Sequence, residues 1–268
     1  MKKILGILIA LMISTKAFAS ITIMPTKVEL NANKTKANYV STSIEVRGDD
    51  KQVMRFKAYT GYFTINELGQ MNQIAESTAP NNLAKKIKFV PSEFTVLPGK
   101  SQKVRLNIVN VNTLPDGENR CVLYIEDVNP KEVPVDTGRA GIGAQLIVKT
   151  RVAVPVYLDK GKFTRLGEFE NFNIKRDKND YYVTGKLINK GNSRLRYTVH
   201  EQIIKDKKLV KEQSLGGGTV GDNNYNNVLT KLDLKDVPGG NYTLRYIIRY
   251  KDEKGKVQNL KQETEIQI

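Results

Sequence analysis

Residues 39–59 read YVSTSIEVRGDDKQVMRFKAY, and their pattern indicates β-structure. Apolar and polar residues alternate from Tyr39 to Val46, and the alternation resumes through Phe56 and Ala58. Because successive side chains of a strand point to opposite faces, each run predicts a strand with one buried face. Glycine and aspartate at positions 48–50 favour a turn between the two strands.

The same pattern continues through the rest of the chain. No apolar period of 3.6 residues persists for twelve residues, so no helix is predicted. Seven or so short strands in each half, separated by turns, are typical of an all-β protein with two immunoglobulin-like β-sandwich domains in tandem. The polar stretches 66–86 and 216–227 are expected to be mobile loops. The further strands are expected at 21–30, 87–90, 94–97, 104–109, 122–128, 144–158, 163–169, 181–188, 195–204, 209–215, 228–234, 242–250 and 257–268.

The first 19 residues are expected to be a cleaved signal peptide. Lys2 and Lys3 precede an apolar run of about ten residues, and Ala17-Phe18-Ala19 provides the small-x-small cleavage pattern before Ser20. No other stretch is apolar enough to span a bilayer, so no membrane insertion is expected after cleavage. Residues 20–160 then form the N-terminal domain and residues 161–268 the C-terminal domain, with the joint at 160–162.

The net charge bears on the class of partner, and the cysteine content bears on disulfide formation. The formal charge is +15, and the three lysines of the leader leave +12 for the mature chain. The lysines are scattered singly, without a basic block or interleaved aromatic residues, so a solvated surface is predicted and a nucleic-acid partner is not. Cys121 is the only cysteine and cannot form an internal disulfide, and its apolar surroundings predict a buried, inert thiol.

Catalytic chemistry is not indicated. His200 is the only histidine, so a two-histidine metal site is impossible, and no serine lies in a nucleophile-elbow pattern. The glycines of 216–221 lack the lysine of a phosphate-binding loop. The sequence therefore predicts a protein that is not an enzyme and has no metal or other cofactor.

Several motifs in the right order carry a resemblance to a known family. Together they resemble the PapD-like periplasmic chaperones of pilus assembly, including the family's first strand, its proline-glycine-arginine segment and the asparagine-glycine-asparagine turn of the second domain. The stretches are 23–28 (IMPTKV), 89–94 (FVPSEF), 97–105 (LPGKSQKVR), 114–118 (LPDGE), 144–157 (AQLIVKTRVAVPVY) and 187–195 (LINKGNSRL).

The resemblance implies a periplasmic location and a role without catalysis. Such a chaperone lends a strand to a pilus or fimbrial subunit that lacks its own final strand, caps it, and delivers it to an outer-membrane usher. The resemblance places the lent side chains at Ile142, Ala144, Leu146 and Val148, which share one face of a strand.

The family also anchors the subunit's C-terminal carboxylate with two basic residues. Lys27 matches the first of them, whereas the second falls on Ala153, which is a departure from the family pattern. Arg151 lies two residues earlier on the same strand face, and we expect it to take this role together with Lys27. Lys149 is a possible auxiliary basic residue.

Two alternatives stay open at this stage. The alternating apolar row in 142–148 is also typical of an ordinary core strand. A structural or adhesive surface protein built of the same immunoglobulin-like domains is the second functional hypothesis. The segment 131–143 is interpreted either as an adaptation to a particular subunit or as a disordered loop.

Overall fold

The computed structural model describes residues 21–129, 131–136, 143–178 and 180–268, and the expected signal peptide lies outside them. Within these residues the chain is built of strands and two short 3-10 turns, η1 (Ala32–Lys34) and η2 (Val111–Thr113). The predicted all-β class is confirmed. None of the described segments is a helix with the length and apolar character needed to cross a membrane.

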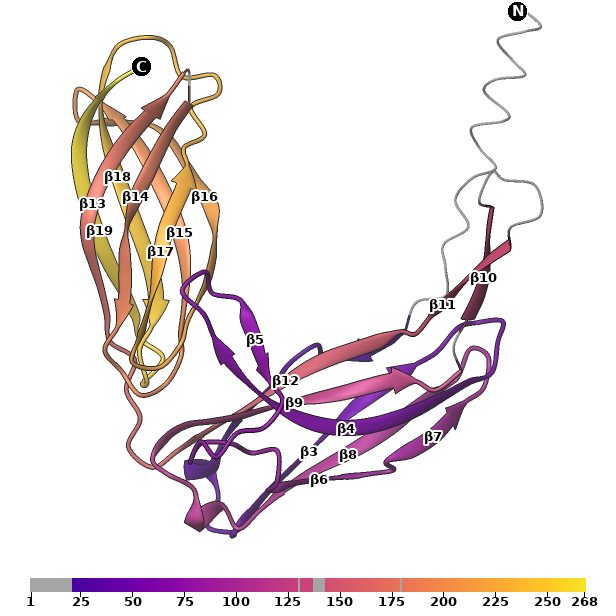
Figure 1. Ribbon diagram of the computed structural model, residues 1–268. Coiled ribbons are helices and arrows are strands. Elements are labelled where there is room, and N and C mark those ends of the chain that lie inside the picture. Colours follow the sequence, from indigo (N-terminus) through magenta and orange to yellow (C-terminus); the bar gives the residue numbers. More distant parts are fainter. Residues whose placement is uncertain (1–20, 130, 137–142, 179) are drawn as a thin grey trace, which may run out of the picture.

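The first half of the chain forms a sandwich of two sheets, seen in the lower part of Figure 1. One sheet has the order β1 (Thr22–Met24), β3 (Tyr39–Arg47), β8 (Ser101–Val109) and β6 (Ile87–Val90). The other has the order β2 (Val28–Asn31), β12 (Arg151–Lys160), β9 (Gly117–Asp127), β4 (Met54–Ile65) and β5 (Met71–Ile74), and β7 (Glu93–Val96) also pairs with β4. Edge strand β2 runs parallel to β12, with Val28 opposite Val156.

The second half forms another sandwich, which rises from one end of the first (Figure 1). Its sheets have the orders β13 (Gly167–Asp177), β14 (Asp180–Asn189), β17 (Asn224–Lys231), and β16 (Lys208–Val220), β15 (Leu195–Lys205), β18 (Asn241–Lys251), β19 (Val257–Gln267). Strand β12 ends at Lys160 and β13 begins at Gly167. We propose the domain boundaries expected from the sequence, 20–160 and 161–268, on this basis.

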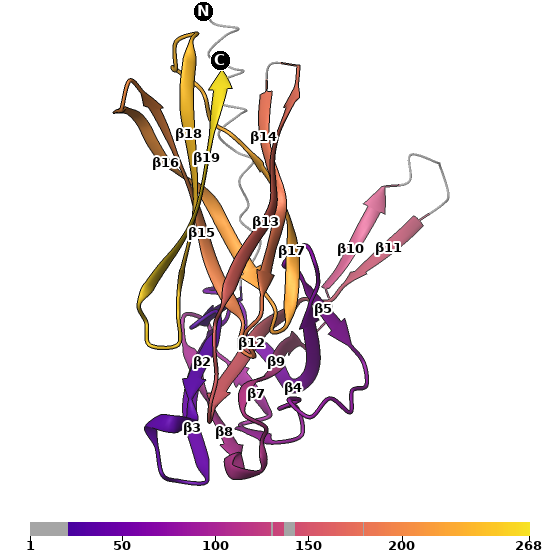
Figure 2. The same ribbon diagram turned by 90° about the vertical axis from the view of Figure 1, so that its left-hand side faces the viewer.

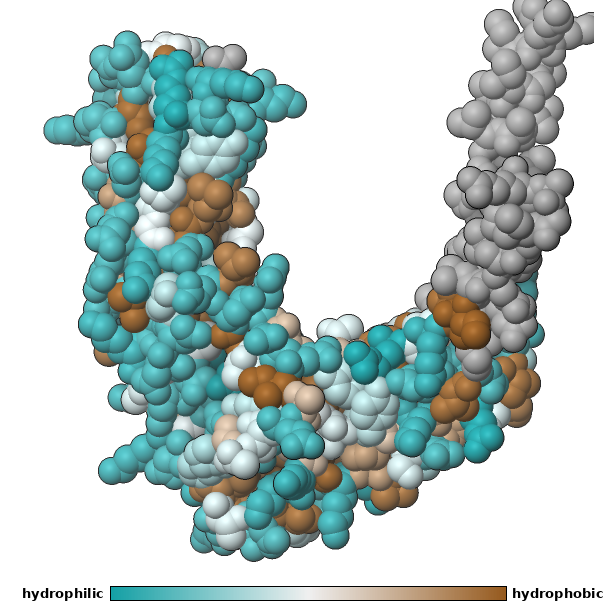
Figure 3. Space-filling view, viewed as in Figure 1, coloured by the Kyte–Doolittle hydropathy of each residue, from teal (hydrophilic) through white to brown (hydrophobic). Residues whose placement is uncertain are grey.

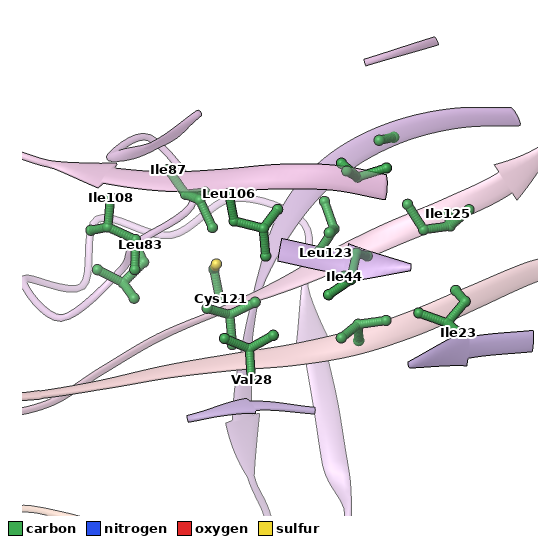
Figure 4. Close-up of a cluster of buried hydrophobic side chains, with 14 of the residues drawn as sticks. Ile23, Val28, Ile44, Leu83, Ile87, Leu106, Ile108, Cys121, Leu123 and Ile125 are labelled. Carbon is green, nitrogen blue, oxygen red and sulfur yellow. The ribbon is translucent and has the colours of Figure 1, made fainter. Parts of the chain in front are cut away.

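Each sandwich has its own hydrophobic core, as the alternating patterns require. In the first, side chains of both sheets meet between the layers (Figure 4), and Ile44, Leu106, Leu123 and Ile125 are at most 1% exposed. Cys121 lies in this core, buried as predicted, and burial raises the pKa of its thiol. The second core includes Leu187, Leu195, Ile203, Leu244 and Tyr246, all fully buried.

Two stretches expected to be mobile loops are better ordered than predicted. Within 66–86, Leu83 is fully buried and its N–H donates to the carbonyl of Arg120. Within 216–227, β16 continues to Val220 and β17 starts at Asn224. A Cβ at Gly217 would lie 2.2 Å from the Tyr197 carbonyl oxygen, so the glycine allows β16 to lie close against β15. The prediction of mobile loops, which was based on their polar and glycine-rich composition, was therefore wrong for these parts of the two stretches.

The predicted single strand 144–158 is also wrong in one respect. It is divided at Lys149 and Thr150 into β11 (Gly143–Val148) and β12. Strand β11 leaves the sandwich and pairs with β10 (Lys131–Asp136), a strand in a segment that the sequence analysis interpreted in part as a disordered loop. The two strands form an arm that projects from the first sandwich at the end away from the second (Figures 1 and 2).

Candidate functional site

The arm presents a strand edge outside both sandwiches. Its antiparallel register runs from Lys131 opposite Val148 to Asp136 opposite Gly143. Among the described residues, β11 pairs with β10 alone, so its other edge carries backbone N–H and C=O groups without a strand partner. Such an edge is a template for pairing with another chain.

The structure describes three of the four expected donor residues. Ala144 and Leu146 lie on β11 at alternate positions, and Ile142 falls outside the described residues. Val148 ends the strand and is 39% exposed, while its neighbour Ile147 is 65% exposed. Hydrophobic surface is visible in Figure 3 where the arm leaves the first sandwich. This end of β11 therefore lies at the surface and not in the core.

Arg151 begins β12 just beyond the arm and is held by aromatic side chains. Its Nη1 donates to the hydroxyl of Tyr59 at 3.1 Å, and its guanidinium lies 4.6 Å from the ring centroid of Tyr124. The two tyrosine rings pack against each other with centroids 5.0 Å apart. The cation–π contact with Tyr124 and the hydrogen bond to Tyr59 together restrict the rotamers of the exposed arginine. Its Nε and Nη2 make no hydrogen bond to the part of the chain that the structure describes, so they are available to a ligand.

Lys149 and Glu126 complete this cluster. Lys149 Nζ lies 2.5 Å from Glu126 Oε1, and the Tyr59 hydroxyl donates to Glu126 Oε2 at 2.7 Å. These contacts with Lys149 and Tyr59 lower the pKa of the Glu126 carboxyl. Lys149 is thereby paired within the protein, which makes it less suited to an incoming carboxylate than Arg151.

Lys27 is exposed immediately before β2 and is separated from Arg151 along the sheet. The next residue, Val28, pairs with Val156, five residues beyond Arg151 along β12, so Lys27 lies about four residues beyond Arg151. At the strand rise this separation is roughly 13 Å. The nearest carboxylate to Lys27 Nζ is that of Glu29, at 3.9 Å. Ala153, where the family would place its second basic residue, is exposed between these levels.

A buried ionic network at the junction of the sandwiches was missed by the sequence analysis. Arg194 Nη1 donates to Glu118 Oε2 at 2.6 Å, its backbone N–H donates to the same oxygen at 2.9 Å, and its Nη2 contacts Glu29. Although burial raises the pKa of Glu29, the hydrogen bond and charge of Arg194 outweigh this and lower it. Arg120 pairs similarly with Asp222 of the second sandwich.

The β4–β5 hairpin adds further contacts between the two sandwiches. The turn after β4 contacts the start of β17, where Asn224 Nδ2 donates to the Ile65 carbonyl at 2.9 Å and the Asn227 N–H donates to the Glu67 carbonyl at 3.1 Å. Polar residues within the quoted motifs, Glu118 and Arg194, were the only sequence signal for this junction, and a single sequence does not reveal that they pair.

His200 lies on β15 beside a threonine hydroxyl. Its Nε2 lies 3.0 Å from the Thr198 hydroxyl, and burial together with the charge of Arg249 lowers the pKa of the imidazole. Within the described ranges, no three histidine, cysteine, aspartate or glutamate side chains are grouped so as to hold a metal ion.

Comparison with known proteins identifies the fold. No protein-family model and no curated protein matches the chain. Among solved structures, the crystal structure of the class 5 fimbriae chaperone CfaA is similar to it, with 16% identity, a TM-score of 0.51, and coverage of 91% of this chain and 99% of that one. The CupB2 chaperone of Pseudomonas aeruginosa aligns at 13% identity with a TM-score of 0.46, covering 90% of this chain and 98% of that one. The likeness to CfaA confirms the two-sandwich fold that the spacing of strands and turns in the sequence predicted.

Proposed function

We propose that this protein is a periplasmic chaperone that binds, caps and stabilises pilus or fimbrial subunits by donor-strand complementation. It then delivers them to an outer-membrane usher, and it acts without catalysis or a cofactor. The observation that carries the proposal is the arm, in which one edge of β11 has no strand partner among the described residues and the end of β11 exposes the apolar Ile147 and Val148. A subunit that lacks one strand would gain main-chain hydrogen bonds along this edge.

Alternate side chains of β11 supply the apolar part of the interaction. Burying each of two or three such side chains in a groove contributes roughly 1.5–3 kcal/mol before the cost of ordering. Arg151 is the favoured contact for a subunit carboxylate, because the Tyr59 hydroxyl and the Tyr124 ring orient it while leaving two nitrogens available. Lys27 supports a carboxylate that approaches further along the same sheet.

Co-expression with candidate subunits tests the donor strand. We expect Leu146→Arg to abolish subunit capture while the free protein still folds, because β11 lies outside the sandwich. Leu209→Arg is the matched control, since Leu209 is 55% exposed on the second sandwich. Capture is measured by co-purification, and folding by circular dichroism. Unaltered capture by Leu146→Arg would show that the donor-strand proposal is wrong.

A separate comparison tests the anchor. Arg151→Ala should weaken capture about 10- to 100-fold, the equivalent of one charge-assisted contact of roughly 1.5–3 kcal/mol. Tyr59→Phe should give a smaller loss, because the arginine loses its orienting hydroxyl and keeps its charge. Arg105→Ala, an exposed arginine on the other sheet, serves as the control. Equal affinity of Arg151→Ala and the control would remove Arg151 from the proposed site.

A further inference from the structure

A pocket of about 740 Å³ lies between the two sandwiches, away from the arm. The first sandwich contributes Glu29 and Leu30 of β2, and Lys34 of η1. The second contributes residues from the start of β15 and the end of β18, among them Arg196 and Arg249. Volumes of about 300–1,000 Å³ are typical of sites for small organic ligands.

The lining of the pocket is strongly basic. Two carboxylates, those of Glu29 and Asp159, lie among six cationic side chains. Both carboxylates are already engaged, because Glu29 pairs with Arg194 and Arg196, and Asp159 accepts from Arg165 Nη2 at 2.5 Å. The cationic residues are Lys34, Arg165, Arg194, Arg196, Arg249 and Lys251.

The excess positive charge is therefore not neutralised within the protein. Lys34 and Lys251 are exposed and form no ion pair with any described residue, and Arg249 has only a 3.6 Å contact with Glu212. Cations from two domains that converge on a hollow attract anions, and the guanidinium fork is suited to carboxylate, sulfonate and phosphate oxygens.

The rest of the lining includes apolar and aromatic side chains beside the polar Asn31 and Thr198. Leu30 of the first sandwich faces the same space as Tyr197, Tyr250 and Val257 of the second, and Val257 is 50% exposed. The Tyr250 hydroxyl accepts from the Gly167 N–H at 3.1 Å, so its polar end is occupied. A free inorganic anion would leave these walls in contact with water, whereas an anion with an apolar body would cover them.

We propose that this pocket binds an organic anion, in which a carboxylate, sulfonate or phosphate group is carried on an aromatic or aliphatic body. The oxyanion contacts Lys34, Arg249 and Lys251, and the body lies against the tyrosines. Because the walls come from both sandwiches, the bound molecule bridges the two domains. The site is separate from the arm and does not depend on the proposed chaperone function.

The probe for this site is 8-anilinonaphthalene-1-sulfonate, an aromatic sulfonate whose fluorescence rises on binding. Lys34→Glu and Lys251→Glu should each raise its dissociation constant at least 5-fold, and the double variant at least 20-fold. Lys261→Glu is the matched control, because this exposed lysine of β19 lies outside the pocket. All three lysines are exposed and without a described ion pair, so the variants should fold, which circular dichroism checks.

A competition experiment distinguishes binding of the probe in the pocket from nonspecific attraction to the basic surface. Decanoate should displace the probe at concentrations at which sodium chloride of equal ionic strength does not. Equal displacement by sodium chloride, or equal weakening in the Lys261→Glu control, would overturn the proposal. Because the exposed apolar end of β11 can also bind the probe, Ile147→Asp is included, and it should leave the charge-dependent binding unchanged. Loss of that binding in Ile147→Asp would place the site on the arm and refute the proposal.

Discussion

At the scale of single residues, Glu201 is an acidic side chain inside the second sandwich. It is fully buried on β15, opposite Tyr246 of β18, and its Oε1 accepts from Gln213 Nε2 at 2.6 Å. Its Oε2 makes no hydrogen bond that meets ordinary geometry within the described part of the chain. Burial raises the pKa of this carboxyl to about 7, although the hydrogen bond from Gln213 and the charge of Lys211 partly oppose the rise.

This raised pKa predicts a stability that falls with pH. Above pH 4.5 the unfolded chain ionises Glu201 while the folded chain keeps it protonated, so the free energy of unfolding declines from about pH 4.5 to about 7 and then levels off. Glu201→Gln removes this dependence. Relative to wild type, the variant should gain about 2 kcal/mol between pH 5 and pH 8, or roughly 4–8 °C in melting temperature.

Thermal unfolding of both proteins at pH 5 and pH 8 provides the measurement. His200→Gln is the control, because burial lowers the pKa of this histidine from an ordinary value that lies in the same range, and its melting temperature should shift by less than that of Glu201→Gln. A difference between wild type and Glu201→Gln that is the same at both pH values would contradict the assignment.

At the scale of elements, period-two alternation was sufficient to predict most strands. Strands β3 and β8 of the first sandwich bury alternate residues as the pattern requires, and so does β4 from Met54 to Ala58. Strand β10 was not predicted, because its composition, with Pro134 and three charged residues, disfavours a strand. Proline is tolerated there since β10 is one edge of a two-stranded arm, a fact of topology that the local sequence does not contain.

The arm should be dispensable for folding. Its strands pair only with each other within the described chain, so replacing residues 131–148 by a short glycine-serine turn should change the stability by less than about 1 kcal/mol. Subunit capture should be lost completely. Urea unfolding and co-purification measure the two effects. A large loss of stability would show that the arm packs on the sandwich, and retained capture would exclude it as the donor.

Only some residues of the proposed subunit-binding site could be predicted from the sequence. The sequence resemblance led to Arg151, Lys149 and β11, but not to Tyr59, which lies 92 residues away and orients Arg151 through its hydroxyl. The distance between Lys27 and Arg151 was likewise hidden, because it follows from the parallel register of β2 on β12. Contacts between distant strands depend on sheet order, and one sequence does not specify that order residue by residue.

At the scale of the whole molecule, the buried ionic network joins the two sandwiches. Glu118 of the first is fully inaccessible at its side chain and Arg194 of the second is 5% exposed. Removing one partner from such a pair leaves the other charge buried without a partner. Arg194→Ala should therefore destabilise the protein by about 3–5 kcal/mol and separate the unfolding of the two domains into two transitions.

Arg196→Ala is the matched comparison for this prediction. Arg196 also pairs with Glu29, but its side chain is 34% exposed, so its loss should cost no more than about 1 kcal/mol. Urea unfolding followed by tyrosine fluorescence and by far-ultraviolet circular dichroism measures both variants. Equal, small losses would mean that the junction depends on the β4–β5 hairpin and not on the ionic network.

The parallel pairing of β2 with β12 has a consequence for the order of folding. Next to these strands, Asn33 exchanges hydrogen bonds with Gly161 across 128 residues of chain. Closing so long a loop is entropically unfavourable, and high contact order slows folding. The amino-terminal edge of the first sandwich can therefore form only after residues near 156–161 have been synthesised, and refolding in vitro should be slow for the same reason.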